Sequence, residues 1–150
     1  MQLTYRHANV DDVVALTALA DRFVESTIYA TVTPPEGRAQ ALAALIENVV
    51  QLGVIFIAEE AVDGIVGMLA ALQVRSTEGG YNYCDELAWF VAPEYRKTGI
   101  GLFLMQAMEK WARQQGLYLC KMVAPAGSRI GQLYESLDYT ALETAYIKRL

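Results

Sequence analysis

The stretch Val91-Ala92-Pro93-Glu94-Tyr95-Arg96-Lys97-Thr98-Gly99-Ile100-Gly101 joins a hydrophobic run to the clearest helical pattern in the chain. Pro93 ends the preceding strand, because proline cannot donate to a central hydrogen-bond ladder. The two glycines lead into a helix whose apolar residues recur at three- and four-residue spacing. Free N–H groups at such a helix start, with Arg96 and Lys97 beside them, predict an anion site, since glycine lets the backbone approach phosphate oxygens.

Two common phosphate-binding motifs do not fit this stretch. A Walker A loop continues with lysine and serine or threonine after its last glycine, whereas Gly101 is followed by Leu102. A dinucleotide fingerprint needs a small residue three positions after its second glycine, and that position is Leu104. On its residues alone the stretch is equally compatible with a plain turn into an amphipathic helix, flanked by two solvated cations.

The chain as a whole has the size and composition of one packed domain. Its 150 residues are 54% hydrophobic and 19% charged, which predicts a single domain over residues 1–150. The net charge of −5 argues against a phosphate-backbone footprint for nucleic acid. Gly64–Val74 is shorter than the roughly 20 residues of a membrane-spanning helix, and residues 1–7 lack the apolar run of a signal peptide. We therefore expect a cytoplasmic protein that binds neither nucleic acid nor a membrane.

Cysteine and histidine are too scarce for two further classes of protein. Cys84 and Cys120 are too few for a disulfide scaffold and lack CxxC spacing. The single histidine, His7, excludes a multi-histidine metal site. No metal site is predicted.

Hydrophobic periodicity and turn residues predict alternating strands and helices around the central stretch. Asn9 and Asp12 are placed to cap a first helix, Thr33-Pro34-Pro35-Glu36 resembles a capping box for a second, and Gly53 ends that second helix. The predicted strands are 1–8, 54–58, 64–75, 81–91 and 117–123, with a last extended segment at 139–149; the predicted helices are 10–30, 33–53, 99–115 and one starting near 128. This order predicts a mixed α+β fold, in which an antiparallel N-terminal meander joins a C-terminal βαβ unit.

Three segments together resemble the GCN5-related N-acetyltransferases, the GNAT superfamily. Arg96-Lys97-Thr98-Gly99-Ile100-Gly101 is similar to the family's Arg/Gln-x-x-Gly-x-Gly/Ala signature. The strand Leu87–Val91 and the following Ala92–Tyr95 are similar to the approach to that signature, and Leu133–Tyr139 is similar to the family's L-Y-E-K-L-G-F segment. The resemblance implies a GNAT-like acyl-CoA N-acyltransferase fold over essentially the whole chain, with acetyl-CoA as co-substrate and no metal.

The resemblance also implies where acetyl-CoA binds. It would lie where the strands ending at Val91 and Val123 splay apart, with Phe90 and Val91 main-chain groups pairing with its pantetheine arm. The backbone from Arg96 to Gly101 would cradle its pyrophosphate. Many members have an asparagine where this chain has Gly127, next to Ser128, and Asp138 replaces the glycine of the last motif. The full set of expected cofactor-binding residues is Trp89, Phe90, Val91, Arg96, Lys97, Thr98, Gly99, Ile100, Gly101, Ser128 and Tyr134.

The catalytic residues implied by the resemblance are Tyr134 and one of two carboxylates. Tyr134 matches the tyrosine that protonates the departing thiolate in many members, although its place on an apolar helical stripe also suits a core tyrosine. Asp85 and Glu86 are candidates for the base that accepts a proton from the amine. They are neighbours on a strand, so only one of them can face the acyl group. Asp85 occupies the position of the glutamate base in histone-modifying members, and we favour it over Glu86.

These features predict an N-acetyltransferase that transfers acetyl from acetyl-CoA to a primary amine by direct attack. The acceptor would be a small molecule or a peptide, and the acidic surface favours cationic amines. By resemblance, the linker that contains Tyr29, Thr31 and Thr33 helps to wall the acceptor site, and a homodimer is compatible with the family. The alternatives are an inactive acyl-CoA-binding sensor or assembly module, and another enzyme with a phosphate-bearing ligand.

Overall fold

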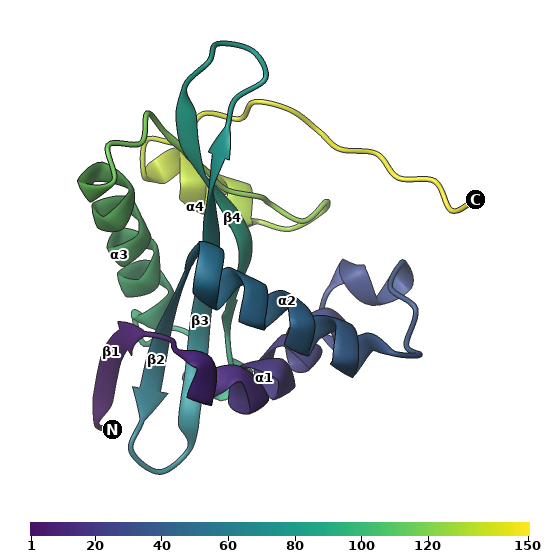
Figure 1. Ribbon diagram of the computed structural model, residues 1–150, viewed down its shortest axis with the longest axis vertical. Helices are drawn as coiled ribbons and strands as arrows, with labels where there is room; N and C mark the ends of the chain where they lie inside the picture. The colour runs from purple at the N-terminus through teal and green to yellow at the C-terminus, as the bar shows by residue number, and fades with distance from the viewer.

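The computed structural model describes all 150 residues as a five-stranded sheet with helices on both faces (Figure 1). The strands follow the chain in the order β1-β2-β3-β4-β5. Every neighbouring pair is antiparallel except β4 and β5, which are parallel. The sheet strands are β1 (Leu3–His7), β2 (Val54–Glu60), β3 (Gly64–Arg75), β4 (Asn82–Val91) and β5 (Cys120–Lys121). The predicted meander and the C-terminal βαβ unit are therefore confirmed.

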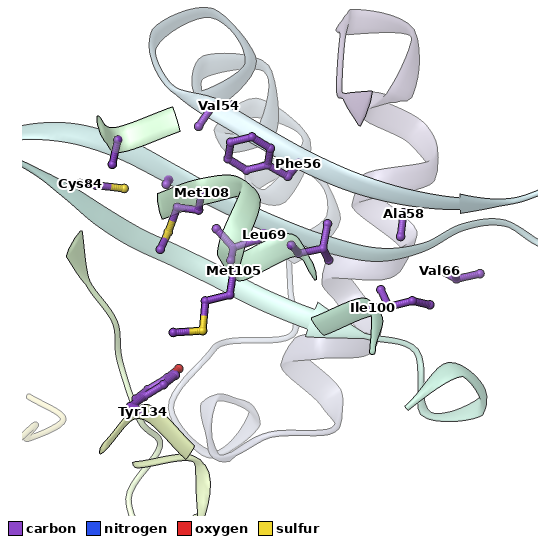
Figure 2. Close-up of a cluster of buried hydrophobic side chains, with 13 residues drawn as sticks. Val54, Phe56, Ala58, Val66, Leu69, Cys84, Ile100, Met105, Met108 and Tyr134 are labelled. Carbon is purple, nitrogen blue, oxygen red and sulfur yellow. The ribbon is translucent and has the colours of Figure 1, made fainter. Parts of the chain in front are cut away.

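The helices divide the core into two layers, one on each face of the sheet. Leu16, Ile57 and Phe90 belong to the layer under α1 and α2. Leu69 and Met105 belong to the layer under α3, which also includes the buried face of α4 (Figure 2). The helical segments are η1 (Val10–Asp12), α1 (Val13–Glu25), η2 (Ile28–Thr31), α2 (Arg38–Leu52), η3 (Pro93–Tyr95), α3 (Ile100–Gln114) and α4 (Ile130–Ser136).

The first helix begins as predicted and ends earlier than predicted. Asn9 and Asp12 form a capping box, in which the Asn9 side chain accepts from the Asp11 N–H and the Asp12 carboxylate accepts from the Asn9 N–H. The helix does not reach residue 30. The Ser26 and Thr27 hydroxyls donate to the carbonyls of Phe23 and Val24, and Thr27 is extended, so these side-chain bonds replace another helical turn.

The second helix begins two residues after the end of the predicted capping box. It starts at Arg38, and its N-cap is Gly37 in the left-handed conformation, with no side-chain cap bond. Thr33 and Pro34 each precede a proline, which disfavours helical backbone at both positions. The predicted end at Gly53 is confirmed.

The C-terminal third has less strand than the pattern predicts. Of the predicted strand 117–123, only Cys120–Lys121 is β5. Residues 140–150 are exposed and form no strand, because no neighbouring strand lies beside them to accept or donate backbone hydrogen bonds. This segment runs away from α4 as the yellow tail of Figure 1. Its tip is held by the Arg149 guanidinium, which donates to the Thr31 carbonyl at 2.9 Å. No helix in the chain is both long and apolar enough to cross a membrane.

Candidate active site

Strands β4 and β5 diverge soon after they meet. Only two residue pairs join them, Cys84 with Cys120 and Asp85 with Lys121. Two residues beyond β5, the Val123 N–H donates to the Glu86 carboxylate at 3.1 Å. The acceptor at this point is therefore a side chain and not the backbone of a neighbouring strand. The sheet is therefore open along the rest of β4, as expected for splayed strands.

A β-bulge lies in β4 at the start of this divergence. Ala70 of β3 faces Ala88, but the next residue, Ala71, faces Glu86, so Leu87 is an extra residue in β4. Glu86 shares a face with Ala71 in the core layer under α3. Asp85 faces Leu72, which packs against the layer under α1 and α2. The two carboxylates thus lie on opposite faces of the sheet.

Glu86 is a buried carboxylate with a raised pKa. Its side chain is almost enclosed, with 8% exposed, and the Val123 N–H is its hydrogen-bond donor. Burial raises its pKa to about 7, while the Val123 hydrogen bond lowers the pKa and the charge of Asp85 raises it. A carboxylate with a pKa near 7 can accept and release a proton at neutral pH.

Asp85 is more exposed than Glu86, and nearby charges shift its pKa in opposite directions. It is half-buried opposite Lys121 of β5. Burial raises its pKa, while the charge of Lys121 lowers it and that of Glu143 raises it. Lys121 is itself paired with Glu143 at 2.9 Å. Asp85 therefore belongs to a charged cluster at the base of the divergence, on the face opposite Glu86.

Tyr134 of α4 approaches the same place from the other side. Its hydroxyl donates to the Val123 carbonyl at 3.0 Å, and its ring stacks on Trp89 with centroids 5.9 Å apart. Figure 2 shows the ring at the edge of the buried cluster. Burial, followed by the nearby charge of Glu86, raises the pKa of Tyr134, so the phenol keeps its proton at neutral pH. Val123, which the sequence marked only as a strand end, thus links Glu86 through its N–H and Tyr134 through its carbonyl.

Tyr29 of η2, which the family resemblance assigns to the wall of the acceptor site, lies near Glu86. It is close enough to Glu86 for that carboxylate to raise its pKa, although burial is the larger cause. Its ring packs on Phe23, with centroids 5.6 Å apart, and Phe23 packs at the same distance on Phe90 of β4. The short helix is therefore held against the strand that carries Glu86.

The loop before α3 forms a cradle of free backbone N–H groups. Lys97 and Gly99 both have positive φ, 65° and 87°. The N–H groups of residues 97–102 have no hydrogen-bond partner within the protein. Such a run of N–H groups at a helix start binds anions, because it concentrates positive partial charge. The anion site predicted from the sequence has the required backbone.

Side chains around this cradle hold its shape. The Arg96 guanidinium donates to the Val91 carbonyl at 3.1 Å and lies 5.5 Å from the centre of the Phe90 ring. The Thr98 hydroxyl donates to the Tyr95 carbonyl at 2.6 Å. Trp89 donates through its ring N–H to the Gly101 carbonyl at 3.2 Å, which fixes the first turn of α3. Ile100 is buried beneath that turn, while Lys97 and Thr98 are exposed.

Ser128 lies apart from this cradle, in the turn before α4. Its N–H donates to the Pro125 carbonyl at 3.0 Å, and the preceding Gly127 has a φ of 76°. Its side chain is exposed and forms no hydrogen bond within the protein. No group of three histidine, cysteine, aspartate or glutamate side chains is arranged to hold a metal ion.

The sequence model of one family, the Acetyltransferase (GNAT) domain, matches residues 51–141, which include β4, the cradle and Tyr134. The chain belongs to the GNAT acetyltransferase family. Curated protein sequences yielded no match to it.

Solved structures share this GNAT fold at low sequence identity. A predicted acetyltransferase from Clostridium acetobutylicum, solved with acetyl-CoA, has a TM-score of 0.80 at 18% identity, over 99% of this chain and 96% of the other. A transcriptional regulator from Bacillus halodurans has a TM-score of 0.79 at 17% identity, over 99% and 100%. AAC(6')-Iy, in complex with the bisubstrate analogue CoA-S-monomethyl-acetylneamine, has a TM-score of 0.77 at 18% identity, over 100% and 99%.

The raised pKa of Glu86 predicts a stability change that depends on pH. The folded protein holds its proton up to about pH 7, whereas the unfolded chain loses it near the ordinary value of 4.5. Wild-type stability therefore falls as pH rises from about 4.5 to 7. We expect Glu86→Gln to be about 3 kcal/mol more stable than wild type at pH 8, with the difference shrinking towards pH 5.

Thermal melts of both proteins between pH 5 and pH 8 measure this change. Glu47→Gln, on the exposed face of α2, removes one negative charge without uncovering a buried group and serves as the control. An identical pH dependence for Glu86→Gln and wild type would contradict the raised pKa.

Proposed function

We propose that this GNAT domain transfers an acetyl group from acetyl-CoA to a primary amine by direct attack, with Glu86 as the base and Tyr134 as the acid. One observation carries the proposal: Val123 joins an enclosed carboxylate of pKa about 7 to a buried, protonated tyrosine where β4 and β5 diverge. General acid–base catalysis needs a proton acceptor and a proton donor held close to one another. This geometry favours Glu86 over Asp85, which lies on the other face of the sheet.

The residues present fit acetyl-CoA. The free N–H groups of residues 97–102 suit a pyrophosphate, and Lys97 adds positive charge in an acidic protein. The Ala92 N–H bonds to Val66 of β3, so by strand alternation the backbone groups of Phe90 face β3 and those of Val91 face the open side. The Val91 N–H and the Trp89 backbone are therefore the part of β4 available to an extended pantetheine arm, since the Val91 carbonyl already accepts from Arg96. When bound, acetyl-CoA supplies the acetyl group as an activated thioester.

Glu86 and Tyr134 would each carry out one proton transfer. Glu86, ionised above about pH 7, accepts a proton from the attacking amine. Tyr134, whose pKa is raised, holds a proton at its hydroxyl oxygen for the departing thiolate. Tyr29 stands near Glu86 on the side from which an amine would approach, and the net charge of −5 favours a cationic acceptor.

Tyr134→Phe tests the acid. We expect turnover to fall by about 10- to 100-fold, because the phenol proton is removed while the ring remains to stack on Trp89. Acetyl-CoA binding, measured by thermal shift, should change little. Tyr139→Phe is a matched control, because that hydroxyl donates to Glu109 of α3 and not to Val123. Unchanged turnover of Tyr134→Phe at every pH would remove Tyr134 from the acid role.

The proposed activity is tested by thiol release from acetyl-CoA over a panel of polyamines, aminoglycosides and peptide amines. We expect release with at least one amine, and a thermal shift with acetyl-CoA alone. A strong shift with no release from any amine would favour the acyl-CoA-binding module. A shift with nucleotides and none with acetyl-CoA would favour an enzyme with another phosphate-bearing ligand.

A further inference from the structure

The chain's two cysteines face one another where β5 joins the sheet. Cys84 and Cys120 are paired in the register between β4 and β5, and both are free thiols. Neighbouring strands lie about 4.8 Å apart, which is within the separation of about 4.4 to 6.8 Å found between the Cα atoms of disulfides. This is one of only two residue pairs that hold β5 to β4.

The two thiols differ in exposure and in acidity. Cys84 is fully buried in the core layer under α3, where Figure 2 shows its sulfur, whereas Cys120 is half-exposed. The interaction between the two thiols lowers the pKa of Cys120 and raises that of Cys84. Cys120 is therefore the thiol that a solvent-borne oxidant meets first and the one that forms a thiolate more readily.

We propose that Cys84 and Cys120 form a redox modification site, which a low-molecular-weight disulfide such as glutathione disulfide converts to an intramolecular disulfide. The Cys120 thiolate attacks glutathione disulfide, forms a mixed disulfide and releases one glutathione thiolate. Cys84 then attacks the Cys120 sulfur, its proton passes to the leaving thiolate, and a second glutathione departs. The two cysteines are oxidised by two electrons, and one glutathione disulfide is reduced to two glutathiones.

The disulfide would act on the site through β5. Bonded cysteines most often hold their Cα atoms about 5.5 to 6 Å apart, farther than the strand spacing of about 4.8 Å, so Cys120 is pushed away from β4. Val123, which links Glu86 and Tyr134, lies three residues further along the same segment. A misplacement of about 1 Å can cost an enzyme about 100-fold in rate. We expect the oxidised protein to transfer acetyl at least tenfold more slowly; this consequence rests on the proposed function, whereas disulfide formation does not.

The test starts with the fully reduced chain, which is incubated with glutathione disulfide, alkylated and measured by intact mass and peptide mapping. We expect wild type to lose two hydrogens as a monomer, with the Cys84 and Cys120 peptides linked. Cys84→Ala should stop at one glutathione on Cys120, because no second thiol remains. Cys120→Ala should stay unmodified, because Cys84 is buried. Cys84→Val, of similar volume, replaces Cys84→Ala if the smaller side chain unfolds the core.

Other outcomes separate the parts of the proposal. A wild-type protein that accumulates the mixed disulfide without linking its cysteines, or a Cys120→Ala that takes up glutathione as fast as Cys84→Ala, overturns the modification site. Oxidised wild type should recover transfer on adding dithiothreitol, and the double alanine variant should be insensitive to the oxidant. Equal rates for oxidised and reduced wild type overturn the effect on the site. A reduced protein that never binds acetyl-CoA contradicts the proposed function and leaves the disulfide measurement standing.

Discussion

Replacing Glu86 with glutamine should lower acetyl-transfer turnover by about 100-fold or more while leaving acetyl-CoA binding intact. Glutamine has the same shape and its amide oxygen can still accept the Val123 N–H, so the hydrogen bond at the divergence is kept. What is lost is the ability to take a proton. The measurement is steady-state thiol release at pH 8, together with the acetyl-CoA thermal shift of the same variant.

Asp85→Asn is the matched control for this loss. It removes a neighbouring carboxylate from the same strand, but on the opposite face and beside Lys121. We expect a change of no more than a few-fold. If Asp85→Asn loses the activity and Glu86→Gln keeps it, the base is Asp85 and the proposed assignment is wrong.

The pH profile adds an independent check on Glu86. Because its carboxylate ionises at about 7, the wild-type rate should rise up to that pH with an amine acceptor whose own ionisation has been corrected for. The residual rate of Glu86→Gln should not show this rise with pH. If the rate of the variant still rises with pH as in wild type, a group other than Glu86 causes the rise.

Replacing Gly99 with alanine should weaken acetyl-CoA binding by about tenfold. Gly99 has a φ of 87°, where a Cβ costs about 1–2 kcal/mol. Open space surrounds the position, so the strain is conformational and not a clash. Relief of that strain turns the peptide groups of the cradle, whose N–H groups then no longer converge on one anion. Binding is measured by titration calorimetry with acetyl-CoA.

Gly37→Ala separates this effect from ordinary destabilisation. Gly37 is the N-cap of α2, has a φ of 72° and is also surrounded by open space, so alanine should cost similar stability there. We expect both variants to melt at lower temperature, and only Gly99→Ala to lose acetyl-CoA affinity. Equal affinity in the two variants would show that the cradle does not bind the anion.

Local features of this protein were predictable where the deciding interactions are close in sequence. The capping box at Asn9 and the end of α2 at Gly53 depend on a few adjacent residues, and both were confirmed. The turn before α3 was also predictable from adjacent residues, and Gly99 has a φ of 87° there. The prediction of a last extended segment was wrong for the opposite reason: a strand needs a neighbouring strand, and none lies beside residues 140–150.

The sequence by itself determined the order of the elements, the parallel unit around α3 and the glycine-rich turn, because hydrophobic period and backbone conformation are local properties. Only the tertiary structure decided which carboxylate lies at the divergence of β4 and β5. The bulge at Leu87, the register against β3 and the docking of α4 together place Glu86 and Tyr134 on Val123. Those contacts join residues far apart in the chain, and burial among them raises the pKa of Glu86 to about 7.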